Sequence, residues 1–251
     1  MEVAPLRLTA APIVEAVVDI DCDMPPALDF NTLVAAGRAT FGGGYPKEQR
    51  RMLSEHEVLM EPGQPPAVKS REGLQAVLYL TEDGKQLVQV RPNGFSFNRL
   101  APYGSLDDYL PEIARTWQLF VGLARPVVCR AVRMRYINRI QLPLNDGKVD
   151  LDLYLKLAPR PADDQRLMLA SFFLQQTLVE PATGNQIAIV FAAQPPTESQ
   201  LPVIFDITVN KPGDVEPGDW AAIAGTIAGL RDLKNLIFRN SLTPECLNLF
   251  R

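Results

Sequence analysis

The chain has 251 residues, of which 47% are hydrophobic and 22% are charged, values close to the average for globular proteins. This composition excludes a disordered chain, and the length predicts one domain (1–251) of two fused halves, residues 1–145 and 146–251. The formal net charge of -4 and a pI near 5.2 exclude a global positive field that would hold a polyanion or an anionic membrane.

The first predicted elements are a strand and a helix. Residues 12–22 place apolar side chains on alternate positions, which is the pattern of a half-buried strand. Residues 29–41 follow a helical spacing that Gly42–Gly44 ends. A turn or two of helix is expected from Pro46, and the prolines within residues 56–72 predict a loop.

A hairpin and a second helix come next. Residues 74–81 and 86–91 are joined by Asp83-Gly84, a pair that favours a tight turn, and a further turn leads into the FSFNRL segment. Ser105 and Asp108 form a capping box for a helix that ends before Arg125-Pro126, and residues 127–143 form a long strand. The order predicts a ferredoxin-like split βαβ half whose first and last strands are antiparallel neighbours.

The second half is predicted to be a three-stranded meander closed by a long helix. Its strands are expected at residues 167–179, 186–193 and 202–210, while residues 149–157 are ambiguous. Asp219 caps a helix from Trp220 to about Arg239, and Thr243-Pro244 opens a short one. The predicted fold class is therefore α+β, with antiparallel sheets and amphipathic helices.

Cysteine usage and the N-terminus indicate a reducing compartment. Cys22, Cys129 and Cys246 are odd in number and lack CxxC spacing, which argues against a disulfide framework or zinc knuckle and predicts buried thiols. The N-terminal segment has no basic region or cleavage pattern. No apolar run reaches the roughly 18–20 residues needed to span a bilayer, so we expect a cytoplasmic protein with no membrane partner.

Four phrases carry a family resemblance: PIVEAVVDI, FSFNRLAPY, RYINRI and a terminal helix running into SLTPE. With them the whole chain resembles an uncharacterised, sporadically distributed family of bacterial proteins of about this size. The family has no assigned activity or catalytic residues. The resemblance implies a bacterial origin and one full-length unit, and it leaves the function open.

An acidic row is the first candidate site. Strand alternation places the carboxylates of Asp19, Asp21 and Asp23 on one face, with Glu15 behind them. Clustered carboxylates can bind Mg²⁺ or Mn²⁺ for phosphoryl-transfer chemistry. The alternative is an exposed strand face whose charges are solvated or paired.

An arginine row is the second candidate site. Arg133, Arg135 and Arg139 share one face of the strand that the predicted topology places beside the acidic one, so cross-strand ion pairs are expected. Alternatively, these guanidinium groups bind phosphate or nucleic acid, with Arg91 and Arg99 extending the patch. Stacking surfaces for bases could then come from Phe95, Phe97 and Tyr103.

Other catalytic motifs are weak. Gly42–Gly44 could form an anion-binding nest, but the flanking P-loop residues are missing, and a helix terminator is the favoured interpretation. His56 is the single histidine and no GxSxG motif is present, which argues against a histidine-dependent triad and excludes a zinc site built on paired histidines.

Three functional hypotheses follow. The leading one is a non-enzymatic binding protein without a cofactor, whose antiparallel sheet is a platform for a protein partner or for a second copy. The rival is a phosphate-ligand or nucleic-acid binding protein, or an enzyme, that uses Mg²⁺ at the acidic row. A third is a role in bacterial defence or toxin neutralisation, which rests on analogy with sporadic distribution.

Overall fold

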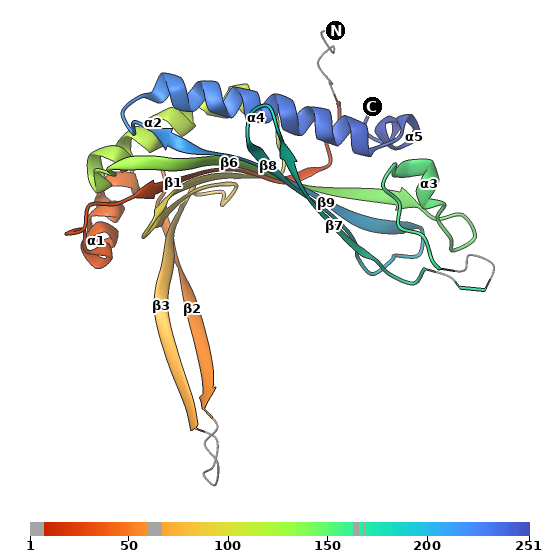
Figure 1. Cartoon of the computed structure of the whole chain (residues 1–251), viewed down its shortest axis with the longest axis horizontal. Helices are drawn as coiled ribbons and strands as arrows, with labels where there is room; N and C mark the ends of the chain where they lie inside the picture. Colours follow the sequence, from red (N-terminus) through yellow and green to blue (C-terminus); the bar gives the residue numbers. More distant parts are fainter. Residues whose placement is uncertain (1–7, 60–66, 163–165, 168) are drawn as a thin grey trace.

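The computed structural model describes residues 8–59, 67–162, 166–167 and 169–251. Figure 1 shows a broad twisted sheet with helices along one face and a long hairpin projecting away from them. The described strands are β1 (Ile13–Asp23), β2 (Lys47–Leu59), β3 (Ala67–Leu80), β4 (Gln86–Arg91), β5 (Gly94–Leu100), β6 (Val128–Pro143), β7 (Phe173–Glu180), β8 (Asn185–Ala193) and β9 (Gln200–Val215). All nine lie in one antiparallel sheet of order β2-β3-β4-β5-β1-β6-β9-β8-β7.

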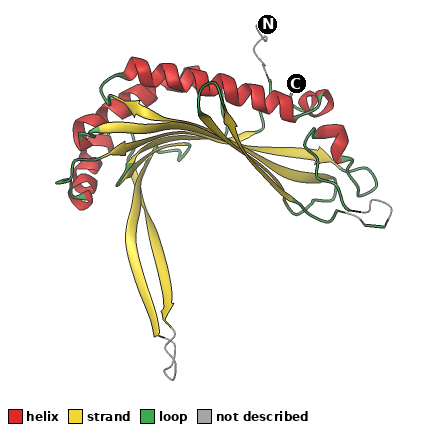
Figure 2. Cartoon of the chain, viewed as in Figure 1, coloured by secondary structure: helices red, strands yellow, loops and turns green. Residues whose placement is uncertain are grey.

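The helices lie on one side of this sheet, as Figure 2 shows. They are α1 (Phe30–Phe41), α2 (Leu106–Ala124), α3 (Leu151–Tyr154), α4 (Trp220–Ser241) and α5 (Pro244–Asn248). Side chains predicted as caps hold the helix starts: Ser105 and Asp108 form the capping box of α2, and Asp219 accepts from the Ala222 amide in α4. Among the described residues, no helix combines the length and apolarity needed to cross a membrane.

The core fills the space between the helices and the sheet. Alternate residues of the central strands, such as Ile20, Met134 and Ile207, are completely buried there. Trp117 of α2 packs its ring against Phe95 and Phe120 and donates its indole N–H to the Pro217 carbonyl at 3.0 Å. On its other face, the sheet has no covering layer of helices in the described part of the chain.

The predicted fold class is wrong. Instead of a split βαβ half and a separate meander, the structure has one continuous nine-stranded sheet. The join is the pairing of β6 with β9, two long strands that stay in register from Ala131↔Pro212 to Pro143↔Gln200. Periodicity identifies each strand but not its neighbour, so the sequence pattern did not reveal this junction. The antiparallel pairing of β1 with β6 is confirmed.

The second error concerns the hairpin. The turn of helix predicted from Pro46, and residues 56–59 and 67–72 of the predicted loop, instead belong to β2 and β3, which pair from Lys47↔Leu80 to Leu59↔Ala67. Figure 1 shows this hairpin standing clear of the helices. Its described outer side chains, including Met52 and Leu53, are exposed, so no buried face imposes apolar alternation. The three prolines at 62, 65 and 66 lie outside the described residues.

Other boundaries agree more closely. The helices predicted at 29–41, after Ser105 and from Trp220 are confirmed, as is the Asp83-Gly84 turn, where Gly84 has φ 66°. The strand predicted from residue 167 begins only at Phe173, because its partner β8 ends at Ala193, opposite Phe172. The Gly42 terminator is also confirmed, with its N–H bonded to the Arg38 carbonyl.

Candidate functional site

The face of the sheet opposite the helices, which we call the open face, gathers most of the predicted site residues. The strand register places Asp19 of β1 opposite Arg133 of β6 on this face, with Asp21 two residues further along β1. Arg135, Arg139 and Arg91 lie on the same face. The sequence therefore predicted correctly that the acidic and arginine rows are neighbours. The ion pairs, however, do not simply join residues that lie directly opposite each other on β1 and β6.

Asp21 is the centre of an ion-pair network. Its carboxylate accepts one hydrogen bond from Arg91 and one from Arg133, each at 2.9 Å. Arg91 reaches Asp21 from two strands away because Gly94, between them in the register, has no side chain. A Cβ at Gly94 would collide with the Ile20 carbonyl oxygen and lie 3.1 Å from the Arg91 guanidinium.

Asp19 closes the network on its other side. It accepts a hydrogen bond from the Ser96 hydroxyl and lies 3.7 Å from Arg91 and 3.9 Å from Arg133. Beyond it, a chain of amides continues: Gln89 donates to Asn98 at 2.9 Å, and Asn98 donates to Glu15 at 2.6 Å. Apart from the buried Nε of Arg91, which has no hydrogen-bond partner among the described residues, these polar groups pair with one another across four strands, as a structural role requires.

The remaining arginines have separate arrangements. Arg135 is bound by Asp206 of β9, with nitrogen–oxygen distances of 2.9 and 2.6 Å, and this carboxylate raises the pKa of the guanidinium. Arg130, which the sequence reasoning missed, links Asp23 to Asp214, and these two carboxylates raise its pKa. No ion pair involves Arg139 in the described part of the chain.

The predicted metal ligands are thus engaged by arginines. Asp23 binds Arg130, whereas Asp19 and Asp21 share Arg91 and Arg133. Among the residues that the structure describes, no group of three or more His, Cys, Asp or Glu side chains is placed to hold a metal ion. The cysteines are buried free thiols, as predicted, and the Cys22 and Cys129 sulfurs lie 3.9 Å apart on adjacent strands.

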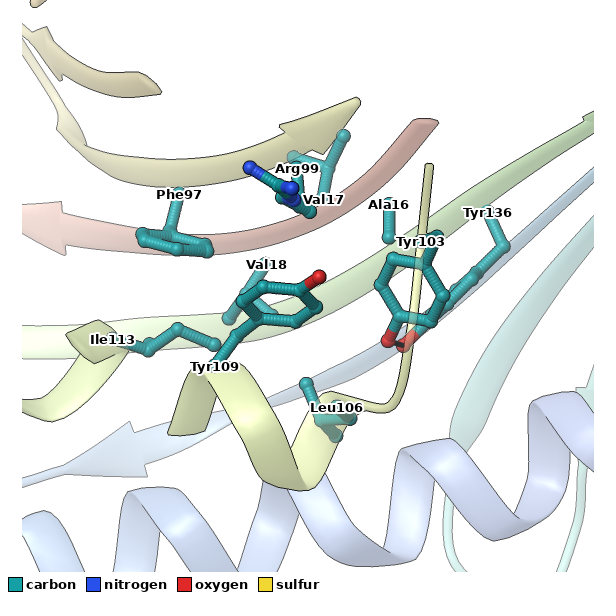
Figure 3. Close-up of a pocket in the computed structure, with 10 residues that line it drawn as sticks. All are labelled: Ala16, Val17, Val18, Phe97, Arg99, Tyr103, Leu106, Tyr109, Ile113 and Tyr136. Atoms are coloured by element: carbon teal, nitrogen blue, oxygen red, sulfur yellow. Dashed lines mark hydrogen bonds between the residues drawn. The ribbon is translucent and has the colours of Figure 1, made fainter. Parts of the chain in front are cut away.

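Arg99 is the one predicted ligand residue on the opposite, helix-covered face. Figure 3 shows it beside Tyr109 in a narrow cavity between β5 and α2, and its guanidinium carbon lies 5.1 Å from the Tyr109 ring centroid. The cavity volume is about 10 Å³, near the minimum for one water molecule. Phe95 and Phe97, predicted as stacking surfaces, are buried on this same face.

Tyr103 also belongs to this cavity. Its hydroxyl lies 3.0 Å from that of Tyr136, and burial raises the pKa of the Tyr103 phenol. Neither phenol faces the arginine row. The predicted patch of arginines and aromatic rings is therefore divided between the two faces of the sheet.

A buried lysine was missed by the sequence reasoning. Lys234 of α4 is only 8% exposed, and its Nζ lies 4.0 Å from the Tyr136 ring centroid. Burial, followed by the nearby charge of Arg231, lowers the pKa of Lys234 to about 8. The helical spacing offers a signal for it, since Lys234 is four residues after Leu230 and four before Phe238, both buried.

The other end of the open face combines apolar side chains with the charge of Arg139. Where β6, β9, β8 and β7 lie side by side, the register aligns Arg139, Ile204, Ala192 and Phe173 in one row. We call these four residues the β7–β6 row. Phe173 is 68% exposed, and Val190 and Ile137 lie on the same face in the adjacent register positions.

Comparison with protein-family models, curated proteins and solved structures finds no match for this chain.

Proposed function

We propose that this chain is a non-enzymatic binding protein that receives a protein partner on the open face, at the β7–β6 row. The observation that carries the proposal is the exposed Phe173 ring, aligned across four paired strands with the exposed Arg139. Aromatic and arginine side chains are the residues most enriched at protein interfaces and at their energetic centres.

The single charge and the apolar side chains of the row define the partner chemistry. The guanidinium of Arg139 has no carboxylate partner in the described residues, while Ile204 and Ala192 separate it from Phe173. A matching surface would offer an apolar side chain to cover Phe173 and Ile204 and a carboxylate for Arg139. We therefore favour a protein surface that has an apolar centre and a carboxylate beside it.

The Asp21 network supports this assignment over the rival one. A phosphate or Mg²⁺ ligand at the two charged rows would have to displace the Arg91 and Arg133 contacts to Asp21, which are already at 2.9 Å. Such a ligand would compensate one side of the pair and leave the other charge, partly buried, without its partner, which is costly. A role in defence or toxin neutralisation remains a prediction about the partner's identity.

The test of this proposal begins at the β7–β6 row. A photo-crosslinking amino acid at position 173 would identify proteins that contact the row in cells, and the purified partner would then be titrated against variants. Arg139→Glu and Phe173→Ser are expected to weaken binding by about 10–30-fold each, a typical loss at an interface centre. Arg38→Glu, an exposed charge reversal on α1, should leave the affinity unchanged.

Two results would refute the proposal. One is a partner that binds Arg139→Glu and Phe173→Ser as tightly as the wild type. The other is stabilisation by millimolar Mg²⁺, Mn²⁺, nucleotide or short RNA that is lost in Asp19→Ala and Asp21→Ala, because this would place a ligand at the charged rows instead.

A further inference from the structure

β7 forms one end of the sheet, and no described strand pairs with its outer side. The Ala193 amide donates to the Phe172 carbonyl, so residues 172, 174, 176, 178 and 180 turn their backbone groups toward β8. By alternation, Phe173, Gln175, Thr177 and Val179 direct their N–H and C=O groups outward. These four residues are a template for another strand.

The two edges of the sheet differ in how they are protected. β2, at the opposite edge, begins Lys-Glu-Gln-Arg-Arg, a run of charges that discourages pairing with another strand. β7 reads FLQQTLVE, with its single charge at the last residue and no proline. Exposed apolar side chains lie along it, with Phe173 68% and Val179 61% exposed.

The pattern of β7 is self-complementary. Around Gln176, the apolar pair Phe173-Leu174 on one side matches the apolar pair Leu178-Val179 on the other. If two copies pair antiparallel about a two-fold axis at Gln176, Phe173 faces Val179, Leu174 faces Leu178 and Gln175 faces Thr177. Each apolar side chain then faces another apolar one, and each polar side chain faces another polar one, so the surface is complementary to its own copy, as a symmetric interface requires.

The backbone pattern agrees with the same register. With Gln176 on the axis, the opposed pairs 173–179 and 175–177 are the hydrogen-bonded pairs, so every outward N–H and C=O from Phe173 to Val179 finds a partner. Gln176 then forms a non-hydrogen-bonded pair with its own copy, at a Cα separation of about 4.5 Å. Because the axis is perpendicular to the sheet, the helices of both copies stay on one side.

We propose that a second copy of this chain pairs with β7 through this register, which joins the two nine-stranded sheets into one. This association goes beyond the proposed function, since it uses the backbone groups at the edge of the sheet, although Phe173 belongs to both: its backbone lies at the edge and its side chain lies on the open face. It also brings two β7–β6 rows together on one continuous face.

The test exploits the axis, because only this register places residue 176 opposite itself. Light scattering with size-exclusion chromatography over a concentration series should show the wild type passing from 27.8 kDa to twice that mass. Gln176→Lys and Gln176→Glu each place like charges on directly opposed residues whose Cα atoms are about 4.5 Å apart, and each should weaken dimerisation by about tenfold or more. An equimolar mixture of the two variants should restore the dimer, since the charges are then opposite.

Matched controls separate repulsion from misfolding. Gln175→Lys and Gln175→Glu carry the same charges but face Thr177, so they should dimerise nearly as the wild type does. Thr177→Pro removes an outward N–H without breaking a bond to β8, so it should abolish the dimer while leaving the circular dichroism spectrum unchanged.

The proposal is overturned if the wild type stays monomeric at several hundred micromolar. It is equally overturned if Thr177→Pro dimerises, or if mixing the two Gln176 variants does not restore association. Arg139→Glu lies on β6, away from this edge, and should weaken partner binding while leaving the dimer intact, whereas Phe173→Ser lies in both sites and does not separate them.

Discussion

Lys234 allows a quantitative test of the packing between α4 and the sheet. Its ammonium group is buried against the Tyr136 ring, and no carboxylate pairs with it in the described residues. The charged neighbour is Arg231, whose guanidinium is itself held by Asp107 of α2 at 2.7 Å. We therefore expect Lys234→Met, which keeps the aliphatic volume and removes the charge, to stabilise the protein.

The magnitude follows from the pKa. Burial lowers the pKa of Lys234 from 10.5 to about 8 in the folded state, and each unit corresponds to about 1.4 kcal/mol, or roughly 3 kcal/mol in total. The cation–π contact with Tyr136 favours the charged form and offsets about 0.5–2 kcal/mol of this. At pH 7 the variant should be more stable than the wild type by about 1–3 kcal/mol.

The sign of the pH dependence is fixed by the same shift. Below pH 8 the lysine is protonated in both states, so the wild type carries the full penalty of burying a charge. Between pH 8 and 10.5 the folded state releases its proton while the unfolded state keeps it, so the wild type gains stability as the pH rises. The advantage of Lys234→Met should therefore shrink toward pH 10.

Urea denaturation of both proteins at pH 7, 8, 9 and 10 measures this difference, and titrations common to the two proteins cancel. Lys156→Met is the matched control, because Lys156 is exposed and its substitution should give no pH-dependent difference. The reasoning is refuted if Lys234→Met is less stable than the wild type at pH 7, or if the gap does not change with pH.

Two further substitutions test the open face. Asp21→Asn removes the charge shared by Arg91 and Arg133 and should lower the free energy of unfolding by about 1–3 kcal/mol in urea titrations. Asp23→Asn, at a half-exposed ion pair, should change this free energy little. Equal effects of the two substitutions would contradict a central role for Asp21 in the network. Gly94→Ala should destabilise the protein by about 2 kcal/mol or more, because the added Cβ meets the Ile20 carbonyl and the φ of 154° at this position disfavours a side chain. A melting temperature equal to that of the wild type would show that β1 and β5 can separate there.

The sequence by itself determined the local structure. Ser105 and Asp219 marked the starts of α2 and α4, Asp83-Gly84 marked a turn, and the alternation around Val18 and Ile20 marked the buried face of β1. The caps, the turn and the alternation depend on groups within a few residues of one another, or on a period that one element must satisfy alone. The pairing of β1 with β6 was also predicted correctly, but from the order of the elements and through a split βαβ topology that the structure does not have.

Tertiary structure decided which strands are neighbours and therefore which charges meet. Arg135 belongs to Asp206 because β9 pairs with β6, and Arg99 lies with Tyr109 because β5 turns that residue toward the helices. Residues 47–54 of β2 gave no pattern because their side chains are exposed or only partly buried on both faces. Strand periodicity fixes the two faces of a strand but says nothing about the strand beside it, and so the single sheet and its self-complementary edge emerge only in three dimensions.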